Sequence, residues 1–123
     1  MNVDATGATT SLHWLSVAQA ARAIAHRELS PVELTQALLD RIARLDPKLN
    51  AFIRVDGDAA LQAARTAEAE IAAGRSRGAL HGVPVGIKDI IDVAGLPTTC
   101  HSKVLIDDVA SADAPARRTM CRI

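Results

Sequence analysis

The sequence has 123 residues, enough for one domain with a single core, and its 14 basic and 14 acidic residues leave a formal net charge of +0. Such a balance provides no positive field that could hold nucleic acid or an anionic membrane, so both are excluded as expected partners. Apolar residues make up 49% of the sequence, many of them alanine, and aromatic residues only 2%. A core built from alanine is thin, which is typical of a piece of a larger protein.

Neither the cysteines nor the beginning of the sequence indicates a secreted or membrane protein. Cys100 and Cys121 are far apart and form no Cys-x-x-Cys motif, so we expect reduced intracellular thiols and no thiolate metal site. The opening MNVDATGATT lacks a basic region followed by an apolar one, and no apolar run reaches the roughly 20 residues of a membrane span. These features predict a soluble, cytoplasmic protein in which residues 1–11 are a disordered lead-in.

Two helices are predicted in the segment that follows. Ser16 can cap a helix over residues 17–28, whose apolar residues share one face. The motif SPVE, which begins at Ser30, combines an N-cap serine, a proline at the first helical position and a glutamate three residues after the serine, which together make a capping box. Apolar residues then recur at helical spacing until Pro47, which is expected to end the second helix.

The next elements alternate in type. AFIRV, residues 51–55, is partly β-branched and bounded by turn residues, so it is interpreted as a strand. A third helix is predicted over 59–73, with Asp58 capping its start and Gly74 ending it. Residues 83–99 place prolines and glycines between β-branched residues, a pattern of short buried strands. Three leading helices and then short buried strands predict an α/β fold, a mixed β-sheet covered by helices.

Lys88 is the residue that most invites a chemical interpretation, because it lies in the middle of the most apolar of these predicted strands. A buried lysine must either pair with a carboxylate or lose its proton, and a neutral lysine is a competent general base. Asp89 should point to the opposite face of an extended backbone, whereas Asp92 could form an ordinary ion pair with Lys88 if the chain bends. From these residues alone, both a structural ion pair and a catalytic base remain open.

The residues before Lys88 also allow two interpretations. Gly82 and Gly86 mark either a close approach of another backbone or ligand, or turns alone. Pro84 between two valines forbids a fully paired ladder at that point.

The run GVPVGIKDIIDVAGLPTTCHS, together with DAP at 113–115, resembles the N-terminal part of the amidase signature family. The upstream motifs SPVEL, LDRI and LDPKLNAFI resemble the leading helices of that family, so the likeness extends from about Leu12 to Pro115. The resemblance implies the amidase signature fold and hydrolysis of carboxamides by a serine, cis-serine, lysine triad. It assigns the catalytic lysine to Lys88 and implies that apolar walls keep the amine unprotonated, ready to accept a proton through a bridging serine.

The other candidate residues are not expected to act in catalysis. The serines Ser76, Ser102 and Ser111 lie outside the Gly/Ser-rich context in which the family carries its two serines and its oxyanion-hole amides. His101 stands where the family more usually has glycine, which weakens a close-approach role for this turn. Neither His101 nor His81 has the spacing of a metal site, so no metal and no cofactor is predicted. Turn capping is the expected role of Thr98 and Thr99.

The resemblance divides the sequence into the lead-in, residues 12–116 as the N-terminal part of an amidase domain, and residues 117–123 as a tail that does not follow the family pattern. We interpret this tail as the result of a truncation or frameshift, although a divergent short protein would also end this way. Because this chain would carry only the lysine, we expect it to be inactive alone.

Three functions are weighed. The main one is an amidase that hydrolyses a linear carboxamide through an acyl-serine intermediate, with a small-molecule amide as its partner, neither nucleic acid nor membrane, and a homodimer as one possible full-length form. The alternative within the same family is the A subunit of a glutamyl-tRNA(Gln) or aspartyl-tRNA(Asn) amidotransferase, which releases ammonia from glutamine. The alternative outside enzymes is a non-catalytic small interaction domain, which should be compact and should unfold cooperatively.

Overall fold

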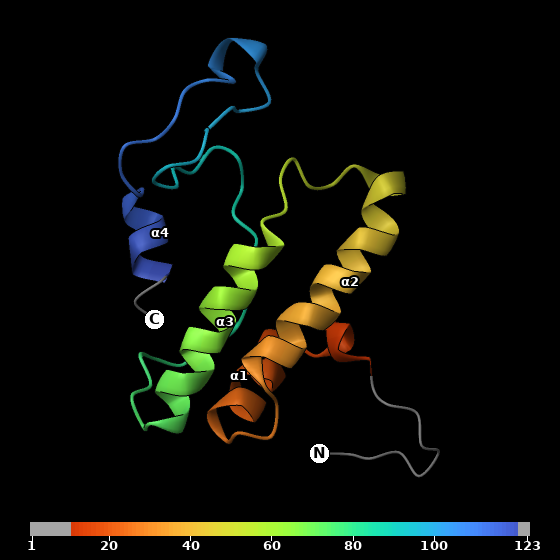
Figure 1. Ribbon diagram of the computed structural model, residues 1–123, viewed down its shortest axis with the longest axis vertical. Coiled ribbons are helices and arrows are strands. Elements are labelled where there is room, and N and C mark those ends of the chain that lie inside the picture. Colours follow the sequence, from red (N-terminus) through yellow and green to blue (C-terminus); the bar gives the residue numbers. More distant parts are fainter. Residues whose placement is uncertain (1–10, 121–123) are drawn as a thin grey trace.

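The computed structural model describes residues 11–120, and the helices dominate it (Figure 1). No β-strand occurs within this range, so the part of the predicted α/β fold that depends on short buried strands is not observed. No helix in the range is both long and apolar enough to cross a membrane. The elements in chain order are η1 (Leu12–Trp14), α1 (Val17–Ala25), α2 (Pro31–Leu49), α3 (Gly57–Ala72), η2 (Lys103–Leu105) and α4 (Pro115–Met120).

The first helix, α1, begins where the sequence predicts. The Ser16 side chain accepts a hydrogen bond from the backbone N–H of Gln19 at 3.2 Å, and the Gln19 side chain accepts one from the Ser16 N–H at 2.8 Å. This reciprocal pair satisfies two of the N–H groups that a helix start leaves without intrahelical partners. The helix ends at Ala25, three residues earlier than predicted, and Arg27 then adopts a left-handed φ of 60° that a helix cannot continue through.

Ser30 is confirmed as the N-cap of α2, although the return bond from the Glu33 side chain that a capping box needs is not found within residues 11–120, and Ser30 also has a long-range partner. Ser30 accepts hydrogen bonds from the backbone N–H groups of Val32 and Glu33, at 3.0 and 3.3 Å. Its hydroxyl donates to Glu68 of α3 at 2.5 Å. One serine therefore both starts α2 and ties it to α3, the helix that packs along it.

The end of α2 differs from the prediction, because Pro47 lies inside the helix, which continues to Leu49. A proline removes one N–H and crowds the preceding turn, but a last turn with few bonds left to lose tolerates it. Asn50 ends the helix with a left-handed φ of 49°. The Asp46 carboxylate then accepts hydrogen bonds from the N–H groups of Ala51 at 2.8 Å and Phe52 at 3.1 Å.

The same contacts explain why residues 51–55 do not form the predicted strand. Two of the N–H groups that a strand would offer to a neighbour are bound to Asp46, and the apolar side chains stay exposed. The next helix, α3, begins at Gly57 with Asp56 as its N-cap, not at residue 59 with Asp58. Its predicted C-terminal signal holds, since Gly74 follows with a left-handed φ of 73°.

The core lies where α1, α2 and α3 meet. Its small size agrees with the expectation of a thin core, since Ile24 is its only large side chain that is less than 2% exposed within residues 11–120. Ala64 and Ala67 are buried on α3, where small side chains allow a close approach to α2. The buried cluster consists of Ala20, Ile24, Leu29, Leu34 and Ile71, and the partly buried Leu12, Leu15, Ala23, Leu38 and Val83 pack against it.

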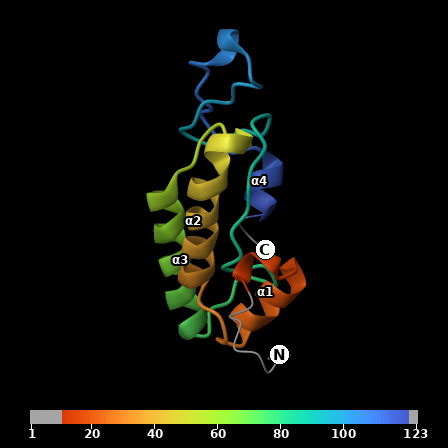
Figure 2. The ribbon, with the colours of Figure 1, turned by 90° about the vertical axis from the view of Figure 1, so that its right-hand side faces the viewer.

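After α3 the chain turns back, runs along the helices and reaches a lobe at their far end (Figure 2). We call residues 89–114 the lobe. No residue of the lobe is buried, so hydrogen bonds rather than a core hold it together. Its one β-like contact is an isolated antiparallel bridge between Pro97 and Val109. The prediction of buried strands over 83–99 is therefore wrong for this chain, because no neighbouring strand within residues 11–120 offers pairing or cover.

Candidate active-site segment

Lys88 lies at the end of an extended, unpaired segment, residues 83–88, immediately before the lobe. Its side chain is exposed, which contradicts the expectation of a buried amine in this chain. No ion pair within 4.0 Å joins Lys88 to Asp92 in the described part of the chain, so the alternative of a structural ion pair is not observed either. Its backbone carbonyl accepts from the Ile91 N–H at 3.0 Å, and the chain therefore turns immediately after the lysine.

Gly82 fixes the place where this segment leaves the helical core. A Cβ at this position would lie 2.9 Å from Cγ of Pro31 and 3.2 Å from Cγ2 of Ile24, and the backbone φ is 87°. The close-approach interpretation of Gly82 is therefore confirmed. Nothing lies within 4 Å of a Cβ built at Gly86.

His81 holds the chain just before Gly82. Its Nε2 lies 3.0 Å from the Glu70 carboxylate and its Nδ1 accepts from the Arg77 backbone N–H at 3.1 Å. The Arg77 side chain also donates from Nε to Nε2 of His81 at 3.3 Å. Arg77 reaches the same carboxylate at 2.7 Å. These contacts fasten the loop after α3 to the last turns of that helix.

Asp89, the residue after the lysine, organises the near side of the lobe. Its carboxylate accepts from the backbone N–H of Thr99 at 3.0 Å, from the Thr99 hydroxyl, and from the N–H of His101 at 3.4 Å. The Asp89 carbonyl also accepts from the Cys100 N–H at 3.0 Å. The contacts of Thr99 with Asp89 and with the His101 N–H agree with its expected role in turn capping.

The turn held by Asp89 has a strained backbone. Cys100 and His101 both have left-handed φ values, 48° and 57°. Glycine adopts this conformation without cost, whereas cysteine and histidine adopt it with strain. Asp89 therefore stabilises a conformation that the local sequence does not favour.

The carboxylate of Asp89 is the basis of a pH prediction. Hydrogen bonds from the Thr99 side chain and backbone hold the Asp89 pKa below the ordinary value of 3.8. A lowered folded-state pKa contributes stability that is present above the unfolded value and is lost as the pH falls through the folded value. The amide protons of Thr99 and His101 should therefore exchange several-fold faster in Asp89→Ala than in the parent at pH 6, and the difference should shrink below pH 3.

Asp92→Ala is the matched control for this experiment, because the Asp92 side chain is exposed and only its backbone carbonyl, which accepts from Ala114 at 3.0 Å, takes part in the lobe. Equal exchange in the two variants at pH 6 would contradict a role for the Asp89 carboxylate.

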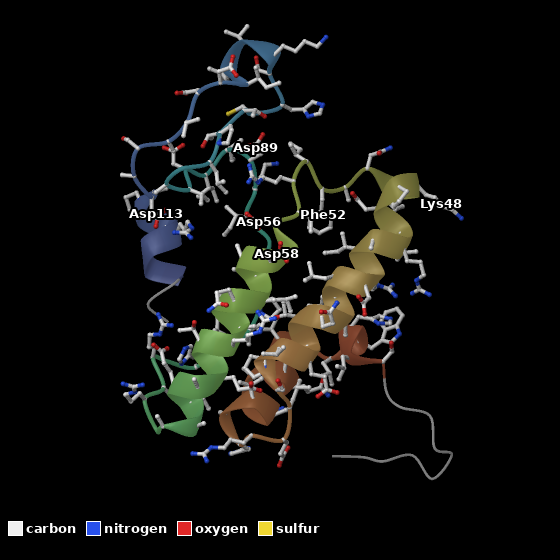
Figure 3. The ribbon with its side chains drawn as sticks, viewed as in Figure 1. Lys48, Phe52, Asp56, Asp58, Asp89 and Asp113 are labelled. Atoms are coloured by element: carbon white, nitrogen blue, oxygen red, sulfur yellow. The ribbon has the colours of Figure 1, made fainter. Side chains whose placement is uncertain are left out.

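Asp113 clamps the far side of the lobe. Its carboxylate accepts from the Ala94 N–H at 2.8 Å and forms an ion pair with Arg117 of α4. Figure 3 shows Asp89 and Asp113 within the same upper part of the molecule. Two aspartates from the motifs KD and DAP thus hold the lobe at both of its ends.

The serines take structural positions. Ser102 accepts from the Val104 N–H at 3.2 Å and caps η2, and Ser76 bonds the Gly78 carbonyl at 3.3 Å. No group of three or more metal-binding side chains occurs among residues 11–120. Sequence reasoning missed the contacts of Glu68 with Ser30 and of Glu70 with His81, since helical surface glutamates carry no local signal of a distant partner.

Comparison with known proteins gives a consistent result. A family model described as Amidase matches residues 33–120. The A subunit of the glutamyl-tRNA(Gln) amidotransferase of Azotobacter vinelandii is 52% identical over 103 residues, which cover 84% of this chain and 21% of that protein. The proteins of the same name from Acidothermus cellulolyticus and Roseiflexus castenholzii are 50% and 49% identical, over 74% and 87% of this chain. The chain spans about a fifth of the length of these relatives.

These names correct one prediction and change the order of two others. The exclusion of nucleic acid, with a small molecule as the only partner, is wrong, because the relatives are named as subunits of an enzyme that is itself named for a glutamyl-tRNA. Zero net charge fails as an argument here because it averages over a chain whose charges can be unevenly distributed. The names also favour the amidotransferase alternative over the main prediction of an amidase for simple linear amides.

Proposed function

The chain belongs to the amidase signature family, and from that premise we propose that it is the lysine-bearing N-terminal part of the A subunit of a glutamyl-tRNA(Gln) amidotransferase. The observation that carries the proposal is the identity of 52% over 84% of the chain with a protein of that name. The reaction of this part is hydrolysis of the side-chain amide of glutamine to glutamate and ammonia. In the whole enzyme the ammonia then displaces phosphate from the glutamate carried by the tRNA, after ATP has phosphorylated the side-chain carboxylate of that glutamate.

Lys88 is the base of this reaction. It accepts, through a bridging serine, the proton that a nucleophilic serine gives up as its oxygen attacks the amide carbon. The proton passes back to the departing nitrogen, which leaves as ammonia, and water then hydrolyses the acyl-serine to glutamate. The support for Lys88 is its place in GVPVGIKD, where the lysine of the matching family motif is catalytic.

Catalysis by Lys88 requires that its exposed amine becomes enclosed. Five large apolar side chains of the extended segment and the lobe are more than half exposed, and they supply an apolar surface for a covering layer. We assign that cover to further polypeptide of the same amidase domain, because the relatives are about four times as long as this chain. Enclosure disfavours the ammonium form and favours the amine that can accept a proton. The five residues are Val85, Ile90, Val104, Ile106 and Val109.

The test is ammonia release by a protein of the relatives' length that contains these residues, assembled with its partner subunits. We expect ammonia from glutamine and, with glutamyl-tRNA and ATP present, transfer of the ammonia to the activated carboxyl group of the tRNA-bound glutamate. Hydrolysis of simple carboxamides such as propionamide without any use of glutamine would contradict the amidotransferase and favour the stand-alone amidase.

A further inference from the structure

The chain has no net charge, but one face of α2 carries several positively charged side chains. Arg41, Arg44 and Lys48 recur at the spacing that places them on one side of a helix, and none of them forms an ion pair within 4.0 Å in the described part of the chain. We call these three residues, together with Trp14 of η1, the α2 cationic face. Lys48 points away from the rest of the molecule at the end of α2 (Figure 3).

Trp14 is held at this face in an unusually open position. Its side chain is 74% exposed, although η1 packs against α2. The guanidinium carbon of Arg41 lies 5.8 Å from the centre of the Trp14 ring, and an Arg41 nitrogen donates to Nε2 of His13 at 2.8 Å. The Arg41 side chain therefore contacts both rings and holds Trp14 in place, while most of the Trp14 surface stays exposed.

The hydrogen bonds and the pKa of His13 reflect the positive charges of the neighbouring arginines. Because Arg41 can only donate, Nε2 of His13 must be unprotonated, and Nδ1 donates to the Ser11 hydroxyl at 2.7 Å. Desolvation, followed by the charges of Arg41 and Arg44, lowers the His13 pKa below its ordinary value. The charges of Arg41 and Arg44 thus act on His13, and neither arginine forms an ion pair within 4.0 Å in the described range.

We propose that the α2 cationic face binds RNA, with phosphates on Arg44 and Lys48 and a base stacked on Trp14. The inference rests on the proposed function and names where this segment of the enzyme contacts its tRNA. A row of cations without ion pairs in the described range, beside an exposed aromatic ring, is the combination that binds single-stranded or looped RNA. An acidic protein would form ion pairs with the cations, but this binding would not require the exposed ring of Trp14.

The spacing of the cations suits a nucleotide strand. From Arg41 to Lys48 the helix rises by about 10 Å at 1.5 Å per residue, which equals about three nucleotides at 3.4 Å each along a helical strand. The face is therefore large enough for a short contact and not for a complete tRNA. It serves as one contact among those of the whole assembly.

The test uses the 123-residue chain, whose only tryptophan is Trp14. A fluorescein-labelled transcript of a glutamate tRNA and an octauridylate are the probes. Anisotropy of the labelled transcript gives Kd, and tryptophan emission reports stacking by the octauridylate. We expect the octauridylate to quench Trp14 emission. The double variant Arg44→Gln with Lys48→Gln should raise the Kd of the transcript about tenfold. It should also reduce the slope of log Kd against log salt concentration by about 2.

The matched control is Arg65→Gln with Arg75→Gln, which removes the same charge from exposed positions on α3 and the loop after it. Far-UV circular dichroism confirms that both double variants fold. Equal Kd values in the two double variants, or unchanged Trp14 emission, would overturn the inference. Equal binding of a polyglutamate peptide would instead identify a surface for acidic protein and would also overturn it.

The outcome is separable from that of the proposed function. Glutaminase activity of the assembled enzyme without tRNA tests the amidase reaction alone. If Arg44→Gln with Lys48→Gln leaves both this activity and the tRNA affinity unchanged, only the RNA-binding inference fails.

Discussion

Replacing Lys88 with methionine should reduce ammonia release from glutamine by about 10³-fold or more in a protein of the relatives' length, since a general base contributes about 10² to 10⁴ and acts as a unit with its nucleophile. Methionine keeps the length and apolar stem of the side chain and removes the amine. The expected loss is in kcat, because Lys88 moves a proton in the reaction and is not assigned to substrate binding. The measurement is the steady-state rate of ammonia production at saturating glutamine.

Lys103→Met is the control for this experiment. Lys103 is also exposed and lies in the same lobe, on η2, so its replacement removes an equal charge from the same part of the molecule. We expect it to leave kcat unchanged. Retained turnover in Lys88→Met, with protein that folds like the parent, would show that Lys88 is not the base and would remove the central residue of the proposed mechanism.

Replacing Gly82 with alanine should destabilise the 123-residue chain by about 2 to 4 kcal/mol, as the sum of a left-handed backbone and an overpacked contact. The φ of 87° is costly for any residue with a Cβ, and the new methyl group would lie 2.9 Å from the ring of Pro31. Neither neighbour can move easily, because Pro31 is a ring at the start of α2 and Ile24 is 1% exposed. The measurement is the change in the urea midpoint of unfolding, followed by circular dichroism.

Gly74→Ala separates the two contributions. Gly74 has a similar φ of 73°, but nothing lies within 4 Å of a Cβ built there. Its alanine variant should therefore lose only the backbone part, about 1 to 2 kcal/mol. If both variants lose the same stability, the contact of Gly82 with Pro31 and Ile24 does not hold the extended segment on the core.

The two halves of the described chain differ in how well local sequence predicts them. Capping signals and helical periodicity predicted α1, α2 and α3, because a helix makes its backbone hydrogen bonds within its own segment. The errors lie at the ends: Asp56 rather than Asp58 caps α3, and Pro47 lies inside α2. Several neighbouring residues can cap or end a helix, and the local sequence does not show which of them does so.

The strand predictions failed for a different reason. The apolar, β-branched residues of 83–99 have strand composition, but a strand exists only when a neighbour pairs with it. Within residues 11–120 the pairing of this segment is limited to the bridge between Pro97 and Val109, and the lobe satisfies its backbone mainly through turns and through Asp89 and Asp113. The exposure of Lys88 follows from the same missing pairing.

The candidate residue itself came from the sequence, because the motif GVPVGIKD identifies Lys88 without coordinates. By itself the sequence determined the three leading helices, the family and the position of the lysine, since each of these depends on short-range patterns. Only the tertiary structure decided the close packing of Gly82 on Pro31 and Ile24, the partners of Glu68 and Glu70, the turn held by Asp89 and the contact of Arg41 with Trp14. Each of these is a contact between residues distant in the chain, whose free energy depends on distance and burial and therefore leaves no mark in the local order of residues.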